Sequence, residues 1–424
     1  MDSILRACAR ARFAAMGIVA FVFAVISSPA PAQELSLRQI LSLAAAHDLG
    51  LPADDARAEA ASALARQANV KPNPVLGVDL ENFAATGAHG VVKSVETTLY
   101  YQQQFERGDK RGARVGVANA DGEVARLRRF IRALDLFRQV QVLWTEAAIA
   151  EASIRIARDQ LDAARLLRDE ITRRVEAARD PLFAGRRADT QVAQAEIALA
   201  QAEIEAENAA AALSPYIGGR EVRLNPTALE TLAEPLPATP ALTLDLALLE
   251  REREAATARI RLEQVRMVPD VTVRGGVRSF GIGDEVALVV GGSLPLGTND
   301  TNRGNIERAE AERAAIEHEI AAARAARDRA VVRLRARLDA NMSEIRRLDA
   351  EIFPKAAETL RLVREGFDQG AFNYIDVIEA QRVVNDASAR RLSVLKNLHT
   401  ERATLDRLTD RFADLIPPAT ETRP

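Results

Sequence analysis

The sequence predicts a mainly helical protein with a membrane β-barrel segment, built from two tandem repeats of a strand pair followed by a long helical hairpin. Three observations support this fold class. Two uninterrupted helical segments are far longer than the helices of a globular core, short alternating segments precede each of them, and one signature recurs 187 residues later. A repeat of this size indicates a duplicated unit.

The recurring signature is "ADTQVAQ" at residues 188–194 and "YIDVIEAQ" at residues 374–381. Asp189 and Asp376 are equivalent in the two copies, and so are Gln194 and Gln381. We expect the signature to begin the returning helix of each hairpin. Both aspartates then suit the first turn, where a carboxylate meets the positive end of the helix dipole.

Residues 1–32 have the pattern of a secretory signal peptide. A basic start is followed by an uncharged apolar run at residues 13–26 and by an A-x-A site that ends at Ala32. The run is too short for a membrane helix of the mature protein. Removing this segment takes away three arginines and one aspartate, so the net charge changes from −3 to −5. A mildly acidic chain argues against nucleic acid as a partner.

The helical segments are long and poor in aromatic residues. One runs from residue 113 to residue 179, and another begins at Arg303 and continues to Ile352. About sixty-five helical residues span ~100 Å, several times the ~30 Å core of a bilayer. Apolar residues in the second segment recur with the coiled-coil step of about 3.5, at Val331, Leu334, Leu338, Met342, Ile345, Leu348 and Ile352.

Each long segment turns back at a loop, at residues 178–189 and residues 367–376. Apolar and small residues at these tips indicate a partner surface, formed by Leu182, Phe183, Ala184, Gly370, Ala371 and Phe372. Asp180 and Asp368 lie at the same tips. They either form an acidic ring at an entrance or are exposed turn residues with local backbone bonds, and the second interpretation is slightly favoured.

Alternating segments precede each hairpin, and they have the length of outer-membrane strands. We expect one face of this sheet to line a lumen, with Gln102, Gln104, Arg274 and Arg278 on it. The other face would contact lipid through Leu99, Tyr101, Val273 and Val277. A soluble sheet with ordinary alternation gives the same period.

The expected boundaries follow from these elements. A signal peptide at 1–32 is followed by a first repeat at 33–213, with strands near 75–83 and 95–105 and a hairpin at 113–213. A linker or equatorial segment at 214–240 leads to a second repeat at 241–415, with strands near 271–280 and 285–294 and a hairpin at 301–415. The chain ends with a tail at 416–424. Four strands cannot close a membrane barrel, which needs about eight. Three copies would supply a 12-stranded barrel and a 12-helix tunnel, so the pattern predicts a homotrimeric conduit.

The sequence offers no catalytic or metal-binding constellation, and we expect no enzyme activity and no cofactor. Among the four histidines only His318 has adjacent carboxylates, in "IEHEI". Neighbouring residues point away from one another on a helix, so this triplet is not a chelating face. The only cysteine, Cys8, lies in the signal segment. A conduit must release its cargo, so transport of metal ions needs no tight site.

Four stretches, taken in order, resemble the TolC family of outer-membrane efflux proteins. They are "KPNPVLGVDLENF" at 71–83, "ETTLYYQQQFERGDKRGARVGVANAD" at 96–121, "LPLGTNDTNRGNIERAEAER" at 294–313 and "GAFNYIDVIEAQ" at 370–381. The second stretch is most similar to the outer-membrane component of cobalt-zinc-cadmium type heavy-metal efflux systems. Asp109 stands where many relatives have a small residue.

The resemblance implies a trimer with a β-barrel in outer-membrane lipid, a helical tunnel across the periplasm, and docking to an inner-membrane efflux pump, directly or through a periplasmic adaptor. It also implies divalent metal cations as cargo. One rival interpretation keeps the channel and changes its cargo to drugs, solvents or a secreted polypeptide. Another is a soluble periplasmic adaptor, which would be expected to carry one coiled-coil hairpin in a compact β-domain instead of two hairpins alternating with strand pairs.

Overall fold

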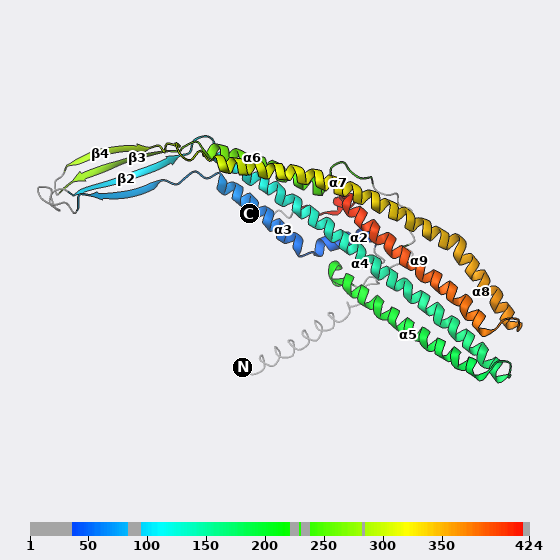
Figure 1. Cartoon of the computed structure of the whole chain (residues 1–424). Coiled ribbons are helices and arrows are strands. Elements are labelled where there is room, and N and C mark those ends of the chain that lie inside the picture. The colour runs from blue at the N-terminus through cyan, green and yellow to red at the C-terminus, as the bar shows by residue number, and fades with distance from the viewer. Residues whose placement is uncertain (1–35, 84–94, 221–228, 230–237, 282–284, 419–424) are drawn as a thin grey trace, which may run out of the picture. The chain divides into compact units, whose positions relative to one another are not determined.

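The computed structural model describes residues 36–83, 95–220, 229, 238–281 and 285–418. The expected signal peptide and most of the segment between the repeats lie outside these residues. The chain divides into two compact units (Figure 1). Unit 1 comprises Met1–Leu43, Val142–Glu234 and Leu348–Lys396, and unit 2 comprises Ala44–Gln141, Pro235–Arg347 and Asn397–Pro424.

Unit 2 contains a four-stranded antiparallel sheet in the order β1-β2-β3-β4. The strands are β1 (Val75–Glu81), β2 (Glu96–Phe105), β3 (Val271–Phe280) and β4 (Val286–Ser293). The central ladder pairs β2 with β3, with Leu99 opposite Val277 and Gln102 opposite Arg274. Within the described strands, β1 and β4 each pair on one side only.

The register sorts the strand side chains into two chemically different faces, because residues opposite each other point the same way. One face carries Leu99, Tyr101, Val273 and Val277 together with apolar residues of the outer strands, among them Leu288 and Val290, which are 85% and 83% exposed. The other face carries Gln102, Gln104, Arg274 and Arg278. The expected grouping of these eight residues is confirmed.

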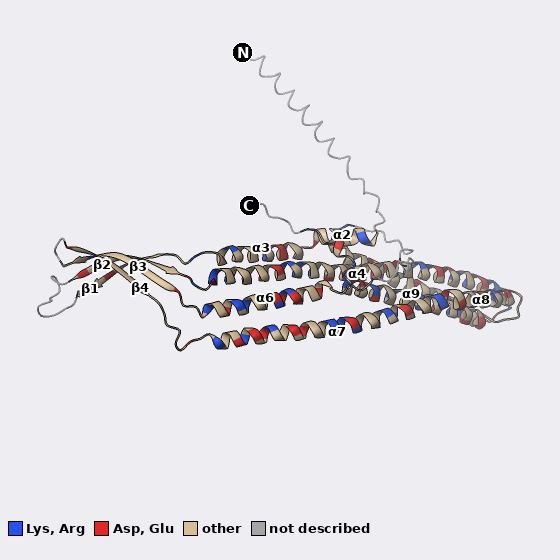
Figure 2. Cartoon of the chain, turned by 90° about the horizontal axis from the view of Figure 1, so that it is seen from above, with Lys and Arg blue, Asp and Glu red and all other residues tan. Residues whose placement is uncertain are grey.

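In the sequence, helices of unit 2 precede and follow each strand pair. They are the end of α2 (Leu37–His47), α3 (Gly50–Ala68), the first part of α4 (Lys110–Glu176), α6 (Leu244–Arg266), α7 (Arg303–Arg347) and the end of α9 (Tyr374–Leu408), followed by the short η5 (Ala413–Leu415). Helix α6 packs along α7. Figure 2 shows basic and acidic residues interspersed along these helices, while the strands contain few charged residues. Helix α4 has 67 residues and spans ~100 Å.

Unit 1 consists of two helical hairpins. The end of α4 turns into α5 (Leu182–Leu213), which is followed by the short η2 (Ser214–Ile217). The π-helical segment η4 (Leu348–Ile352) leads into α8 (Phe353–Asp368), which turns into α9. Ile171, Ala188, Phe367, Tyr374 and Val377 form a buried cluster between the hairpins. This cluster explains why both turns lie at one end of the unit.

A π-helical segment interrupts the apolar stripe, which the sequence pattern predicts to continue to Ile352. Val331, Leu334, Leu338, Ile345 and Leu348 are buried as expected, but Ile352 is 43% exposed. A π-helical turn holds an extra residue and therefore rotates the side chains that follow it. Pro354 lies at the start of α8, where its missing N–H removes a hydrogen bond from the preceding turn.

A cluster of charged side chains lies at the end of α9 in unit 2, and Asp406 and Arg407 are its most buried members. Arg407 binds Asp135 and Asp245 with nitrogen–oxygen distances of 2.6 and 2.7 Å. Nearby, Asp406 is almost fully buried, and Arg402 and Arg411 lie 3.1 and 3.2 Å from its Oδ1. Burial nevertheless raises the pKa of Asp406 to about 6, against the opposing effect of Arg402.

The raised pKa of Asp406 predicts a pH-dependent stability. The folded state holds this proton more tightly than the unfolded chain, so the free energy of unfolding falls as the pH rises from about 4 to about 6, by roughly 3 kcal/mol for this group. An Asp406→Asn variant lacks this contribution. The stability of the wild type relative to the variant should therefore fall across that range, measured by thermal unfolding in detergent.

Asp386→Asn is the control, because its side chain is 74% exposed and its pairing with Arg382 is long, at 3.8 Å. The difference between wild type and this control should stay constant with pH. A constant difference between wild type and Asp406→Asn would contradict the assignment.

Candidate functional site

The turn of the first hairpin is organised by Arg174, in the last turn of α4. Its carbonyl accepts hydrogen bonds from the N–H groups of Arg179 and Asp180, at 2.8 and 3.3 Å. Its guanidinium pairs with the Asp180 carboxylate at 2.8 Å. Asp180, one of the two acids expected at an entrance, therefore has its charge balanced within its own turn.

Arg174 also joins the first hairpin to the second. Its Nη1 donates to the carbonyl oxygen of Phe367 at 2.7 Å, and its Cζ lies 4.2 Å from the centre of the Phe367 ring. Phe367 belongs to the buried cluster beneath the turns. The sequence analysis did not predict this role of Arg174. The only local signal for it is a basic side chain in the last turn of a helix.

The turn of the second hairpin is a Schellman motif. The N–H of Ala371 donates to the Gly366 carbonyl at 2.7 Å, and the N–H of Gly370 donates to the Phe367 carbonyl at 3.0 Å. Gly370 has φ +83°, a left-handed conformation that favours glycine. The ring of Phe372 covers Gly366 so closely that a Cβ there would clash with it.

Helix α9 then begins with a reciprocal cap. The side chain of Asn373 accepts hydrogen bonds from the N–H groups of Ile375 and Asp376, at 2.8 and 3.2 Å. The Asp376 carboxylate accepts in return from the Asn373 N–H at 2.9 Å. The expected first-turn position of Asp376 is therefore confirmed.

The matching expectation for Asp189 is wrong. Helix α5 begins at Leu182, directly after Pro181 in an extended conformation, so Asp189 lies about two turns inside the helix. Proline has no N–H to satisfy and a fixed φ, and it starts the helix early. The two glutamines differ as well, since Gln194 is exposed whereas Gln381 accepts a hydrogen bond from Arg364 at 2.8 Å.

Three large apolar side chains remain exposed at the two turns. Leu182, Phe183 and Phe372 are 75%, 70% and 46% exposed, and we call them the tip patch. Gly370, Ala371 and Asp368 are also exposed. Ala184 is buried among the residues of the cluster beneath, so its expected place on a docking surface is wrong: the helix turn that presents Leu182 and Phe183 points it inward.

A groove of about 440 Å³ with both apolar and charged lining residues lies beside the π-helical segment of unit 1. It is lined by residues of α4, η4, α8 and α9, including Arg155, Asp159 and Phe353. Arg391 forms a two-pronged pair with Asp349 here, at 2.7 and 3.2 Å. The charges of the groove are therefore partly balanced by one another.

The polar face of the sheet in unit 2 carries a tightly held arginine. The Nη1 of Arg278 binds Glu96 at 2.6 Å, its Nη2 binds Glu81 at 2.7 Å, and its Nε donates to the Thr98 hydroxyl at 2.9 Å. Arg274 is held more loosely, 3.6 Å from Asp79. We call Arg278 with its two carboxylates the Arg278 clamp.

The junction between strands and helices of unit 2 depends on Asp270. Its carboxylate accepts hydrogen bonds from the Lys110 ammonium at 2.8 Å, from the Gln104 amide at 3.0 Å and from the Arg107 N–H at 3.1 Å. Asp109, in the same junction, adopts a left-handed φ of +62°. Aspartate tolerates this conformation better than most residues, which explains why it fits the position.

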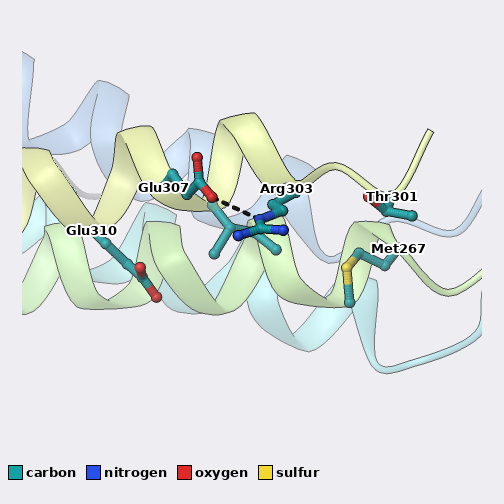
Figure 3. A pocket seen from close by; sticks show the side chains of 6 residues that line it. Met267, Thr301, Arg303, Glu307 and Glu310 are labelled. Atoms are coloured by element: carbon teal, nitrogen blue, oxygen red, sulfur yellow. Dashed lines mark hydrogen bonds and ion pairs between the residues drawn. The ribbon is translucent and has the colours of Figure 1, made fainter.

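A second hollow, of about 420 Å³, lies beside the start of α7 (Figure 3). Met267, Thr301 and Glu310 line it, and Glu307 is paired with Arg303 at 2.7 Å. Across the described ranges no cluster of three or more histidine, cysteine or acidic side chains could hold a metal ion. Nor is any described helix both long and apolar enough to cross a membrane.

The contacts of Arg174 predict its effect on the hairpin end. Arg174→Met keeps the apolar stem but loses the ion pair and the bond to Phe367, so the unfolding free energy of this region should fall by roughly 2 kcal/mol. The measurement is the rate of chymotrypsin cleavage after Phe183, which local opening accelerates.

The matched control is Arg173→Met, whose side chain is 69% exposed and pairs with Glu170 on the same helix. This control should be cleaved at the wild-type rate. Equal cleavage rates for both variants would show that Arg174 does not hold the two hairpins together.

Comparison with known proteins agrees with this architecture. Residues 241–410 match the outer membrane efflux protein family. The chain is 28% identical over 389 residues to the cobalt-zinc-cadmium resistance protein CzcC of Cupriavidus metallidurans, an alignment that covers 89% of this chain and 90% of CzcC. It is 30% identical over 285 residues to the nickel and cobalt resistance protein CnrC of that organism, covering 64% of this chain and 65% of CnrC.

A solved structure supports the fold at lower identity. The open state of the MtrE outer membrane channel of Neisseria gonorrhoeae superposes with a TM-score of 0.70 and 19% identity over 88% of each chain. The matched family is one of transport components. The chain is an outer-membrane efflux protein homologous to the metal-resistance proteins CzcC and CnrC of C. metallidurans.

Proposed function

We propose that three copies of this chain form a passive, non-enzymatic conduit that carries divalent heavy-metal cations out of the cell. The observation that supports it most strongly is the sorting of charge on the sheet. Every charged side chain of the described strands lies on one face, namely Asp79, Glu81, Glu96, Arg274 and Arg278. The opposite face is uncharged and rich in exposed apolar side chains.

This arrangement matches the wall of a membrane barrel, where lipid-facing and lumen-facing residues alternate. One chain supplies four strands, and β1 and β4 each have an unpaired edge among the described residues. Unpaired edges in lipid would leave backbone groups unsatisfied, so closure needs further copies. Three copies give the twelve strands of the proposed barrel, with the polar face inside.

The proposal divides the chain into two equivalent repeats, residues 33–213 and residues 241–415, with the segment 214–240 between them. Each repeat contributes one strand pair and one hairpin to the trimer. The long helices then form the wall of a periplasmic tunnel, because α4 alone is several times longer than a bilayer is thick.

The tip patch is the proposed docking surface for a periplasmic adaptor or for the inner-membrane pump itself. Large apolar side chains at an exposed turn are stable there when a partner covers them. Gly370 and Ala371 allow a partner to approach the backbone of the second turn closely. Asp368, which is exposed, remains a candidate acid at the tunnel entrance, whereas Asp180 is balanced by Arg174.

The cargo is inferred from the relatives. CzcC is described by resistance to cobalt, zinc and cadmium, and CnrC by resistance to nickel and cobalt. Metal-binding clusters are lacking among the described residues, which is compatible with a conduit that must release its ions.

The two faces of the sheet give the first test. Val290→Arg places a charge on the apolar face, and it should destabilise the membrane-inserted protein by about 2–4 kcal/mol if the residue faces lipid near the midplane. Val289→Arg is the matched control, since it is the adjacent residue of β4 on the polar face. We expect less heat-sensitive trimer in outer-membrane fractions for Val290→Arg alone, and equal yields would argue against the proposed orientation.

The cargo and the tip patch are tested together in a strain that lacks the gene. Intracellular zinc, cobalt, cadmium and nickel are measured under a sublethal load of each metal. At least one should accumulate in the deletion strain and fall when the wild-type gene is restored. The double variant Leu182→Asp, Phe183→Asp should form trimers but fail to lower the metal, because its tip patch is charged.

Ile197→Asp serves as the control for the tip variant, as Ile197 is 59% exposed on α5 but lies away from the turn. It should restore export. Unchanged metal levels in the deletion strain would refute the metal cargo, whereas full activity of the tip variant would refute docking at this patch.

A further inference from the structure

The polar face of the sheet combines basic and acidic side chains in a way that bears on the charge of the cargo. The described strands place two arginines and three carboxylates on this face, a net charge of −1 for each chain. A face with two arginines could favour anions if those arginines were free. Their state of pairing therefore decides which ions the face attracts.

Arg278 is held by partners on every nitrogen of its guanidinium, two of them carboxylates. All three nitrogens of its guanidinium are engaged, with Glu96, Glu81 and Thr98, at 2.6 to 2.9 Å. The ligands come from β1 and β2 while Arg278 lies in β3, so the clamp is built by the register of three strands. Its side chain is only 25% exposed.

The clamp holds one positive and two negative charges, so it accounts for the excess negative charge of the face. Arg274 and Asp79 balance each other, although their 3.6 Å separation is too long for a hydrogen bond. The Arg274 guanidinium also lies 5.7 Å from the centre of the Tyr100 ring. These contacts keep the second arginine against the wall as well.

We infer that Glu81 and Glu96 determine the charge preference of the conduit for cations, by neutralising Arg278 and leaving one carboxylate charge in excess. This inference rests on the proposed trimeric conduit with the polar face inside. In the trimer the three clamps would form a ring of net charge around the lumen. Divalent cations would be attracted to it and small anions repelled.

The strength of the effect follows from Coulomb's law. A unit charge ~10 Å from an ion in water changes the local ion concentration about twofold. Converting the clamp from −1 to +1 in each of three chains should therefore shift the ratio of cation to anion permeability severalfold. The shift is largest at low ionic strength, since the Debye length is about 30 Å at 0.01 M salt.

The test uses the purified full-length trimer in planar lipid bilayers, with the reversal potential measured across a gradient of dilute KCl. The wild type should prefer potassium to chloride. The double variant Glu81→Gln, Glu96→Gln releases Arg278 and should move the preference toward chloride. Arg278→Gln leaves both carboxylates unpaired and should move it in the opposite direction, toward potassium.

Asp79→Asn is the matched control, because it removes one carboxylate of the same face but leaves the clamp intact. Its shift should be smaller than that of the double glutamine variant. Opposite shifts for the two clamp variants cannot come from general damage to the sheet. An unchanged permeability ratio, or shifts in the same direction, would overturn the role of the clamp.

The outcomes also separate this inference from the proposed function. A wild-type protein that conducts ions, with clamp variants that do not alter its selectivity, supports the conduit and refutes the clamp. A wild-type trimer that conducts no ions when inserted refutes the conduit, and the clamp with it.

Discussion

The structure depends on a sheet that one chain cannot complete. Its four strands present an uncharged face with side chains as exposed as Leu288 and Val290, and its outer strands have open edges within the described residues. In water such a face costs roughly 25 cal/mol for each Å² of apolar surface left exposed. In the proposed trimer, lipid on one face and neighbouring copies at the edges would relieve both problems. The stability of this sheet is therefore expected to depend on the membrane and on assembly with further copies.

Arginines fix the geometry at points where the backbone changes direction. Arg174 joins two hairpin turns through an ion pair, a carbonyl and an aromatic ring. Arg278 ties three strands together, and Arg407 binds two aspartates from other helices. A planar guanidinium with five donors can hold several partners at once, which lysine cannot do. This explains why so many arginines in this chain are structural.

The sequence predicted most of the fold because its signals were long and periodic. The alternation in residues 96–105 and 271–280 gave the two faces of the sheet correctly, since a period of two leaves no ambiguity once the strands are in register. The buried stripe of α7 followed from its regular step. The errors occurred where a single residue changes the local geometry. Pro181 moved the start of α5, and with it Asp189 and Ala184.

The interactions of individual side chains were harder to predict. Arg174 and Phe367 are 193 residues apart, and nothing near either residue indicates the other. The clamp partners Glu81 and Arg278 are likewise distant in sequence and meet only through the register of three strands. Such contacts form only in the completed fold. The local sequence pattern therefore predicts the two faces of the sheet but not the individual ion pairs.

The two helical hairpins share one plan but differ in how their first, long helices are built. Helix α4 runs without interruption for 67 residues, while the helical segment that leads into the second hairpin is divided into α7, η4 and α8. The division falls where the buried stripe ends and Ile352 becomes exposed. Because a π-helical turn and Pro354 both weaken the hydrogen-bond ladder, bending costs less there than in α4. The second hairpin therefore has a defined weak point that the first lacks, and bending of its helices costs least there.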